Sequence, residues 1–295
     1  MAAVYLFVER GRITTAIDIL KKTAALNRGF LNVTDRHVSW VAPKIRDLEA
    51  MARRRPSNYS RKKRGVFRNP ELWRDLVAAR GRLRENTSSL EAAWRTTAGR
   101  EAGTSARRWA VALRNEVLFG LGLAYPLRVG NVVAMELGRH YDPVNHAIRF
   151  DAEETKNELE IDFELPDEGS LGDLRALVDT YIAEARPVLL AGRRSSYFFI
   201  PDARGGLKLR TRAVNAILAD LSRRFLADVL PKGVDVLNPH LLRHASATYQ
   251  LAVRRDLNLA AQILNISPAT VSVSYADVLE SRKEATKRFL SSFNT

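Results

Sequence analysis

Apolar residues in the first hundred positions recur three and four apart, a spacing that places them on one face of a helix. The segments ITTAIDILKKTAAL (residues 13–26) and VSWVAPKIRDLEAMA (38–52) have this spacing, and neither shows the alternation typical of a strand. The pattern predicts an all-α amino-terminal half.

The pattern changes to a period of two between His146 and Leu165. One run alternates through Ile148, Phe150 and Ala152 and the next through Leu159, Ile161, Phe163 and Leu165, with Lys156 and Asn157 between them. Two alternating runs with a short connection predict a β-hairpin with one buried face.

Helical spacing returns after the hairpin in the segments LGDLRALVDTYIAEA, TRAVNAILADLSRRFLADVL, HLLRHASATYQLAV and LNLAAQILNI. Ser267 as N-cap and Pro268 at the first helical position then open a further helix, ATVSVSYADV. We therefore expect a mainly α fold with one small antiparallel β-sheet.

A length of 295 residues exceeds that of one typical domain and favours two. A patch containing Gly, Thr and Ser, from Thr96 to Ser105, precedes the apolar helix WAVALRNEVLFGLGLAY and suggests the boundary. We expect a helical, basic domain over residues 1–103 and a second domain over residues 104–295.

The charge of the chain narrows the choice of partner. Forty-seven Lys and Arg against 33 Asp and Glu give a formal net charge of +14, which favours nucleic acid as the partner.

The chain has no cysteine, which excludes disulfides, thiolate zinc sites and cysteine nucleophiles. Because it has no run of about 18 apolar residues and no secretory leader at its start, we expect a cytoplasmic, nucleoid-associated protein rather than a membrane protein.

The densest basic stretch lies between residues 53 and 68 and contains no acid. Its cations are Arg53, Arg54, Arg55, Arg61, Lys62, Lys63, Arg64 and Arg68, with Tyr59 and Phe67 interleaved. Such a stretch is either a solvated linker or a DNA-binding segment that contacts phosphates at any sequence. The net charge of the whole chain favours the second interpretation.

Phosphoryl transfer without cysteine needs an oxygen nucleophile, a base, an acid for the leaving oxygen and cations for the phosphoryl oxygens. His240 and Arg243 are three apart at the start of a helix, so they share a face and could reach one phosphate. Arg128 opens the apolar segment RVGNVVAMEL, where a buried guanidinium would need an anion. Taken alone, these residues also fit a solvated helix end and an ordinary salt bridge.

Lys156 is the one cation among nine acids between Phe150 and Ser170. At a hairpin tip it could deliver a proton, or it could simply keep an acidic hairpin soluble. The acids could in turn hold two Mg²⁺ ions for nuclease chemistry. The alternation of Glu158, Glu160, Asp162 and Glu164 with apolar residues is, however, typical of the solvated face of a strand.

Four segments, taken in order, resemble the conserved boxes of the tyrosine recombinase, or phage integrase, family: PLRVGNVVAMEL, ETKNELEIDFELP, NPHLLRHASATYQLA and ILNISPATVSVSYADV. The resemblance covers residues 104–290 and implies a catalytic set of Arg128, Lys156, His240, Arg243 and Tyr275. Tyr275 lies 32 residues after Arg243, within a helix whose own pattern suggests only core packing. The amino-terminal half is similar to the core-binding domain of the family only in being helical and basic.

The resemblance implies a site-specific recombinase or integrase that needs no metal, cofactor or ATP. Arg128 and Arg243 would clamp the scissile phosphate. Tyr275, with an unperturbed pKa of about 10, would attack it after losing its proton to His240. Lys156 would protonate the departing 5′ oxygen, which leaves a 3′-phosphotyrosyl link. The implied assembly is a homotetramer on double-stranded DNA, and a monomer or weak oligomer without it.

Two positions depart from the family pattern. Ile266 stands where His or Trp commonly donates a hydrogen bond to the phosphate, and the loss of such a donor can cost on the order of 10²-fold in rate. Asn265 or Ser267 could donate instead. Asn131 stands where the family often has an acid. Ile266 keeps open a weakened relative that only binds DNA. A type IB topoisomerase-like enzyme and a metal nuclease also stay open.

Overall fold

The structure is a computed structural model, and it describes residues 13–30, 39–54, 65–202, 206–275 and 278. The chain divides into two compact units, residues 1–64 and residues 65–295. Residue 104, where the sequence suggests a domain boundary, lies inside the second unit, so the helix before it packs together with the residues that follow. The division into domains near residue 104 stays a prediction.

Within the described part of the first unit, α2 (Ile13–Phe30) and α4 (Val41–Arg54) pack against each other. Their small core consists of Ala16, Ile17, Leu20, Val41 and Leu48. These residues recur at helical spacing, so the helices predicted for this half are confirmed.

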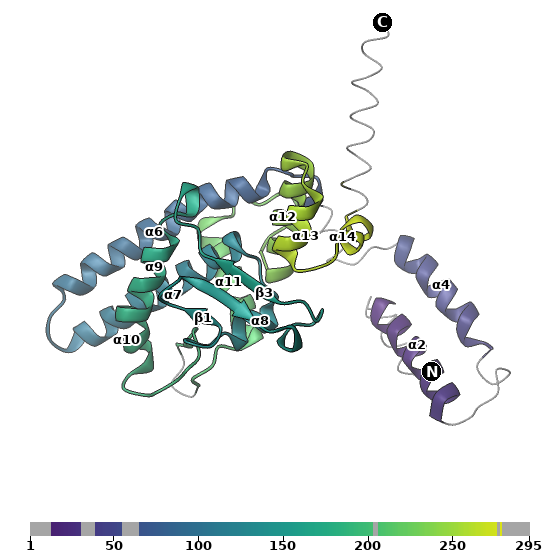
Figure 1. Cartoon of the computed structure of the whole chain (residues 1–295), viewed down its shortest axis with the longest axis horizontal. Coiled ribbons are helices and arrows are strands. Elements are labelled where there is room, and N and C mark those ends of the chain that lie inside the picture. Colours follow the sequence, from purple (N-terminus) through teal and green to yellow (C-terminus); the bar gives the residue numbers. More distant parts are fainter. Residues whose placement is uncertain (1–12, 31–38, 55–64, 203–205, 276–277, 279–295) are drawn as a thin grey trace, which may run out of the picture. The chain divides into compact units, whose positions relative to one another are not determined.

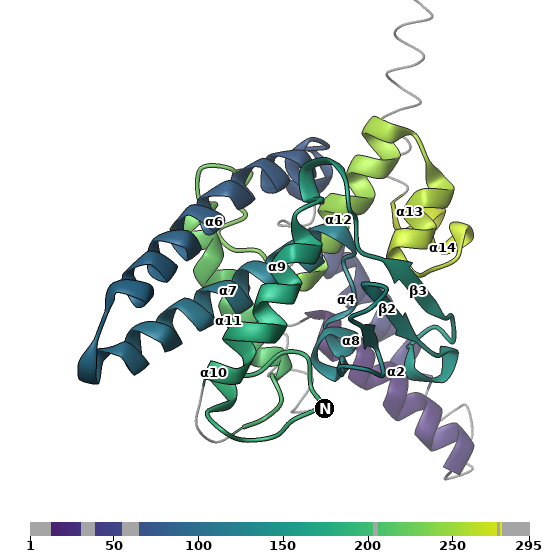
Figure 2. The same cartoon turned by 60° about the vertical axis from the view of Figure 1, so that its left-hand side comes forward.

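The two longest helices of the second unit, α6 (Leu72–Thr96) and α7 (Ala102–Ala124), lie side by side (Figures 1 and 2). Near the turn that joins them, the rings of Trp94 and Trp109 stack at a centroid distance of 4.4 Å. The break is shorter than the predicted patch from 96 to 105, because α7 already begins at Ala102.

A partly buried ion pair joins α6 to the segment that leads into α9 (Leu174–Thr180). The guanidinium of Arg80 donates to both carboxylate oxygens of Asp173, at 2.7 and 3.0 Å. Glu116 of α7 lies 3.6 Å from the same guanidinium. A charge buried in this way is stable only with its partners, so these three residues lock the helices together.

The sheet is antiparallel, in the order β1 (Tyr141–Asp142), β2 (Ala147–Phe150) and β3 (Ile161–Glu164). Phe150 pairs with Ile161 and Ala147 with Glu164, which confirms the predicted hairpin. The strands are shorter than the alternation suggests, because a short 3-10 turn that Asp151 caps follows β2 and takes in Ala152.

The remaining α-helices in the part of the chain that the structure describes are α8 (Val129–Ala134), α10 (Arg186–Leu190), α11 (Thr211–Phe225), α12 (Pro239–Tyr249), α13 (Leu257–Leu264) and α14 (Pro268–Ser274). The side chain of Ser267 accepts a hydrogen bond from the Thr270 amide, which confirms the predicted N-cap of α14. Tyr275 directly follows α14 instead of lying within a helix. In the part of the chain that the structure describes, no helix is long and apolar enough to cross a membrane.

Candidate active site

Arg128 and Arg243 line one open cavity of about 510 Å³. Arg128 is the N-cap residue of α8 and is half-buried. Desolvation by burial lowers its pKa. A desolvated guanidinium of this kind favours an anion as its partner. Asn131 and the β3 residue Asp162 contribute further to the cavity wall.

Arg243 on α12 is buried, and backbone oxygens hold its guanidinium. One terminal nitrogen donates to the Pro126 carbonyl, and the other donates to the Leu264 carbonyl at 2.5 Å. Desolvation and then the charge of Arg128 lower the pKa of Arg243 to about 10, so it remains a cation at neutral pH. The side chain thereby joins the segment before Arg128 to the end of α13.

His240 lies at the start of α12 and is exposed, but it belongs to the same electrostatic group. Desolvation, followed by the positive charges of Arg243, Arg128 and Lys156 in that order, lowers the pKa of its imidazole. Lys156 itself is exposed on the connection between β2 and β3. The structure therefore brings these four predicted residues within electrostatic reach of one another.

Reciprocal hydrogen bonds tie the connection that carries Lys156 to the turn between α13 and α14, which lie next to the hairpin in Figure 2. Asn157 donates through Nδ2 to the carbonyl of Asn265 at 2.7 Å. Asn265 donates through its own Nδ2 to the carbonyl of Leu159 at 3.0 Å. Asn265 has a φ of 48°, a left-handed conformation that asparagine tolerates better than most residues. We call this arrangement the asparagine clamp.

Tyr275 is only 3% exposed and packs in a cluster with α12, α13 and α14. Its hydroxyl lies 2.8 Å from Nδ1 of His244. The ring of Phe67 contacts both, with centroid distances of 5.4 Å to His244 and 5.3 Å to Tyr275. The charge of a Tyr275 phenolate raises the pKa of Arg243, which places the tyrosine within reach of the arginine as well.

His244 was not among the site residues expected from the sequence. It follows Arg243 directly and lies four residues after His240, so a second histidine on the same helix face was a signal that could have found it. Its contact with Tyr275 spans 31 residues, and no local pattern indicates a contact of that length.

The acids of the hairpin lie on a solvated face, as their alternation predicts. Glu158, Glu160, Asp162 and Glu164 are all exposed. Asp162 accepts a hydrogen bond from Arg149 at 3.1 Å. Among the described residues, no group of three or more His, Cys, Asp or Glu could hold a metal ion.

Most of the basic stretch lies outside the described residues, namely Arg55, Arg61, Lys62, Lys63 and Arg64. The backbone of Arg53 and Arg54 forms the last two residues of α4, but their side chains are also outside the description. Arg68 is exposed in a turn before α6. The role of the stretch in DNA binding stays a prediction.

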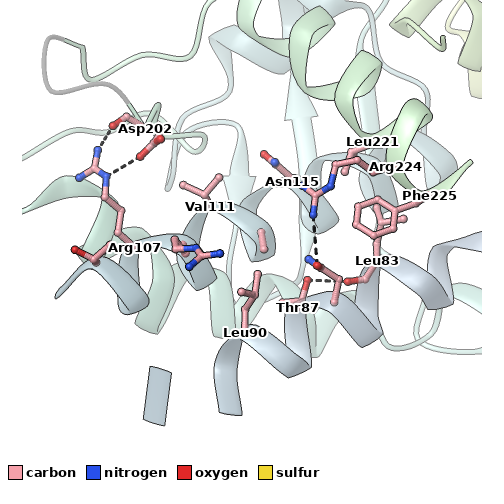
Figure 3. A pocket seen from close by; sticks show the side chains of 14 residues that line it. Leu83, Thr87, Leu90, Arg107, Val111, Asn115, Asp202, Leu221, Arg224 and Phe225 are labelled. Atoms are coloured by element: carbon pink, nitrogen blue, oxygen red, sulfur yellow. Dashed lines mark hydrogen bonds and ion pairs between the residues drawn. The ribbon is translucent and has the colours of Figure 1, made fainter. Parts of the chain in front are cut away.

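A second cavity, of about 350 Å³, is lined by residues of α6, α7 and α11 (Figure 3). Arg107 donates to Asp202 at 2.6 Å, and Arg224 donates to Asn86 at 3.5 Å. Two of its arginines are thus engaged with neighbours, and none of the five predicted catalytic residues lines it. The candidate site is therefore the cavity of Arg128 and Arg243.

Comparison with known proteins identifies relatives over part of the chain. It is 28% identical over 181 residues to the tyrosine recombinase XerC of Bifidobacterium longum (strain DJO10A), a match over 59% of this chain and 46% of that protein. It is 31% identical over 105 residues to the tyrosine recombinase XerD of Vibrio vulnificus (strain YJ016), over 36% of this chain and 32% of that protein. The chain is related to the tyrosine recombinases. The matches span less than half the length of both recombinases, and no protein-family model matches.

The positions that depart from the tyrosine recombinase pattern differ in their local contacts. Ile266 packs against the apolar cluster that buries Tyr275. The side chains of Asn265 and Ser267, the two expected substitutes for a phosphate donor, are engaged in the asparagine clamp and in the α14 cap. Asn131 is only 6% exposed, lines the arginine cavity, and its Nδ2 donates to no described residue.

Proposed function

We propose that the chain is a site-specific DNA strand transferase that cleaves and rejoins DNA through a 3′-phosphotyrosyl intermediate. The observation that carries this proposal is the cavity that Arg128 and Arg243 line together, with His240 in the same electrostatic group and Tyr275 within reach of Arg243. Cations arranged before substrate arrives are the main source of rate acceleration in phosphoryl transfer. The kinship with XerC and XerD supports the same chemistry.

In this mechanism the scissile phosphate occupies the cavity between the two arginines. Arg243, fixed by the Pro126 and Leu264 carbonyls, needs no reorganisation when negative charge develops on the phosphoryl oxygens. Arg128 offers a desolvated guanidinium for the same oxygens. His240, neutral near pH 7 because its pKa is lowered, joins them at the phosphate.

Tyr275 supplies the nucleophile and Lys156 the acid. The phenolic oxygen forms a bond to phosphorus while the bond to the 5′ oxygen breaks, and Nζ of Lys156 gives that oxygen its proton. The phosphotyrosyl bond keeps the energy of the broken phosphodiester, so a second strand can be joined without ATP. In the cell the partners are double-stranded DNA in the cytoplasm and three further copies of the chain, which complete a homotetramer on two sites.

A nicked suicide duplex tests this function. When cleavage releases a short 5′ fragment, religation stops and the covalent complex accumulates. We expect an adduct that forms in EDTA and is absent in Tyr275→Phe. Adduct formation that depends on Mg²⁺ would indicate a nuclease instead, and relaxation of supercoiled DNA without strand exchange would indicate a topoisomerase-like enzyme.

Two observations favour a second candidate, a DNA-binding relative with little cleavage activity. Tyr275 is buried, so its hydroxyl meets a phosphate only after local rearrangement, and Ile266 donates no hydrogen bond. This candidate predicts tight binding to duplex DNA without any adduct, even on the suicide substrate.

A further inference from the structure

We propose that His244, not His240, accepts the phenolic proton of Tyr275 during strand cleavage. This inference rests on the proposed recombinase chemistry and assigns its first proton transfer. It also changes the role expected of His240, which then serves the phosphate alone.

Geometry favours His244 as the acceptor. Its Nδ1 lies 2.8 Å from the Tyr275 hydroxyl, within the range required of a general base. With the imidazole proton on Nε2, Nδ1 has a lone pair and accepts the hydrogen bond from the phenol. A base must first lie within hydrogen-bond reach of the proton that it removes, and His244 does.

Burial removes water as the competing acceptor. Tyr275 is 3% exposed, and Phe67 contacts both its ring and the imidazole of His244. A phenol shielded in this way loses its proton to a protein group rather than to solvent. His240, by contrast, belongs to the electrostatic group of Arg128, Lys156 and Arg243.

The step balances in protons and bonds. As the phenolic oxygen of Tyr275 bonds to phosphorus, its proton moves to Nδ1 of His244, which becomes an imidazolium. The bond to the 5′ oxygen breaks, and that oxygen takes a proton from Nζ of Lys156. During religation His244 returns its proton to the departing tyrosine, and Lys156 takes up the proton of the attacking 5′ hydroxyl.

Paired substrates and variants test this assignment. His244→Asn keeps a hydrogen-bond acceptor on a short side chain but is not a base at neutral pH, whereas His244→Phe keeps only the ring shape. Each is measured on a suicide duplex with a normal 5′ oxygen and on one with sulfur at that bridging position, because a thiolate leaves without a proton. Phe67→Leu is the packing control, and melting temperature and duplex binding report on folding.

We expect His244→Asn to slow adduct formation by about 10² to 10⁴-fold on both substrates, the usual contribution of a general base. Lys156→Ala should be slow with the oxygen substrate and recover with the sulfur substrate. In DNA-free protein carrying ¹³Cζ-labelled tyrosine, His244→Phe should shift the Tyr275 resonance, because the phenol loses its hydrogen-bond partner.

Three results would overturn the assignment. A wild-type rate in folded His244→Asn shows that another group takes the proton, and recovery of that variant on the sulfur substrate shows that His244 acts on the leaving oxygen. If the wild-type protein forms no adduct, the proposed function fails and this inference fails with it. If the wild-type protein forms the adduct and the His244 variants form it at the same rate, the role of His244 fails but the proposed function stands.

Discussion

At the scale of single residues, partial desolvation and nearby cations both lower the pKa of His240. Desolvation and then the charges of Arg243, Arg128 and Lys156 lower its pKa below the unperturbed value of about 6.5. Because the folded-state pKa is lowered, the stability that the neutral imidazole contributes is present above about pH 6.5 and is lost as the pH falls through the folded pKa.

An NMR titration of the His240 ring measures this effect. We expect a midpoint below about 6.5 in the wild-type protein and a higher midpoint in Lys156→Gln, because a nearby positive charge is gone. Lys208→Gln, which removes a lysine over the Tyr197 ring, is the matched control and should leave the midpoint unchanged. A wild-type midpoint at or above the unperturbed value contradicts the electrostatic grouping.

Ile266 is the residue at which the proposed active site lacks an expected hydrogen-bond donor. The substitution Ile266→His restores a donor, and we expect faster adduct formation, by up to about 10²-fold. Ile266→Leu controls for packing against the cluster around Tyr275. If the histidine brings no gain, a group already present donates to the phosphate, and Asn131→Ala should then reduce the rate.

At the scale of elements, the asparagine clamp makes a hairpin connection and a helix turn act together. Asn157→Ala removes one of its two hydrogen bonds, and Asn265→Gly removes the other without straining the left-handed backbone. We expect each to lower the free energy of unfolding by about 0.5–1.5 kcal/mol.

The same variants should slow cleavage on the oxygen substrate more than on the sulfur substrate, because the clamp positions Lys156. A double-mutant cycle in urea unfolding and in adduct rate tests the coupling. Effects of the two substitutions that simply add would show that the hydrogen bonds act separately.

The sequence predicted elements that have a strong local signal. The hairpin follows from its period of two, and the start of α14 follows from Ser267 and Pro268. β1 has only two residues, too few to show a period. The asparagine clamp and the contact between His244 and Tyr275 join residues 108 and 31 positions apart, and such contacts depend on packing that no local pattern encodes.

At the scale of the whole molecule, the formal charge of +14 predicts DNA binding that depends strongly on salt. Lys62→Gln with Lys63→Gln should reduce the slope of log affinity against log salt concentration by up to about 1.8, or about 0.9 for each phosphate that the protein no longer neutralises. The control is Arg82→Gln with Arg95→Gln, which removes the same amount of charge. These arginines are already paired with Asp228 and Glu91, so the slope should change less. Equal effects of the two pairs in fluorescence anisotropy would contradict the role proposed for the basic stretch.

The central claim is that Tyr275 becomes covalently attached to DNA, and mapping the adduct tests it most directly. Wild-type protein trapped on a suicide duplex is digested with protease and nuclease, and the modified peptide is sequenced by mass spectrometry. We expect a single 3′-phosphonucleotide on the phenolic oxygen of Tyr275. A nucleotide on any other residue, or the complete absence of a modified peptide, would contradict it.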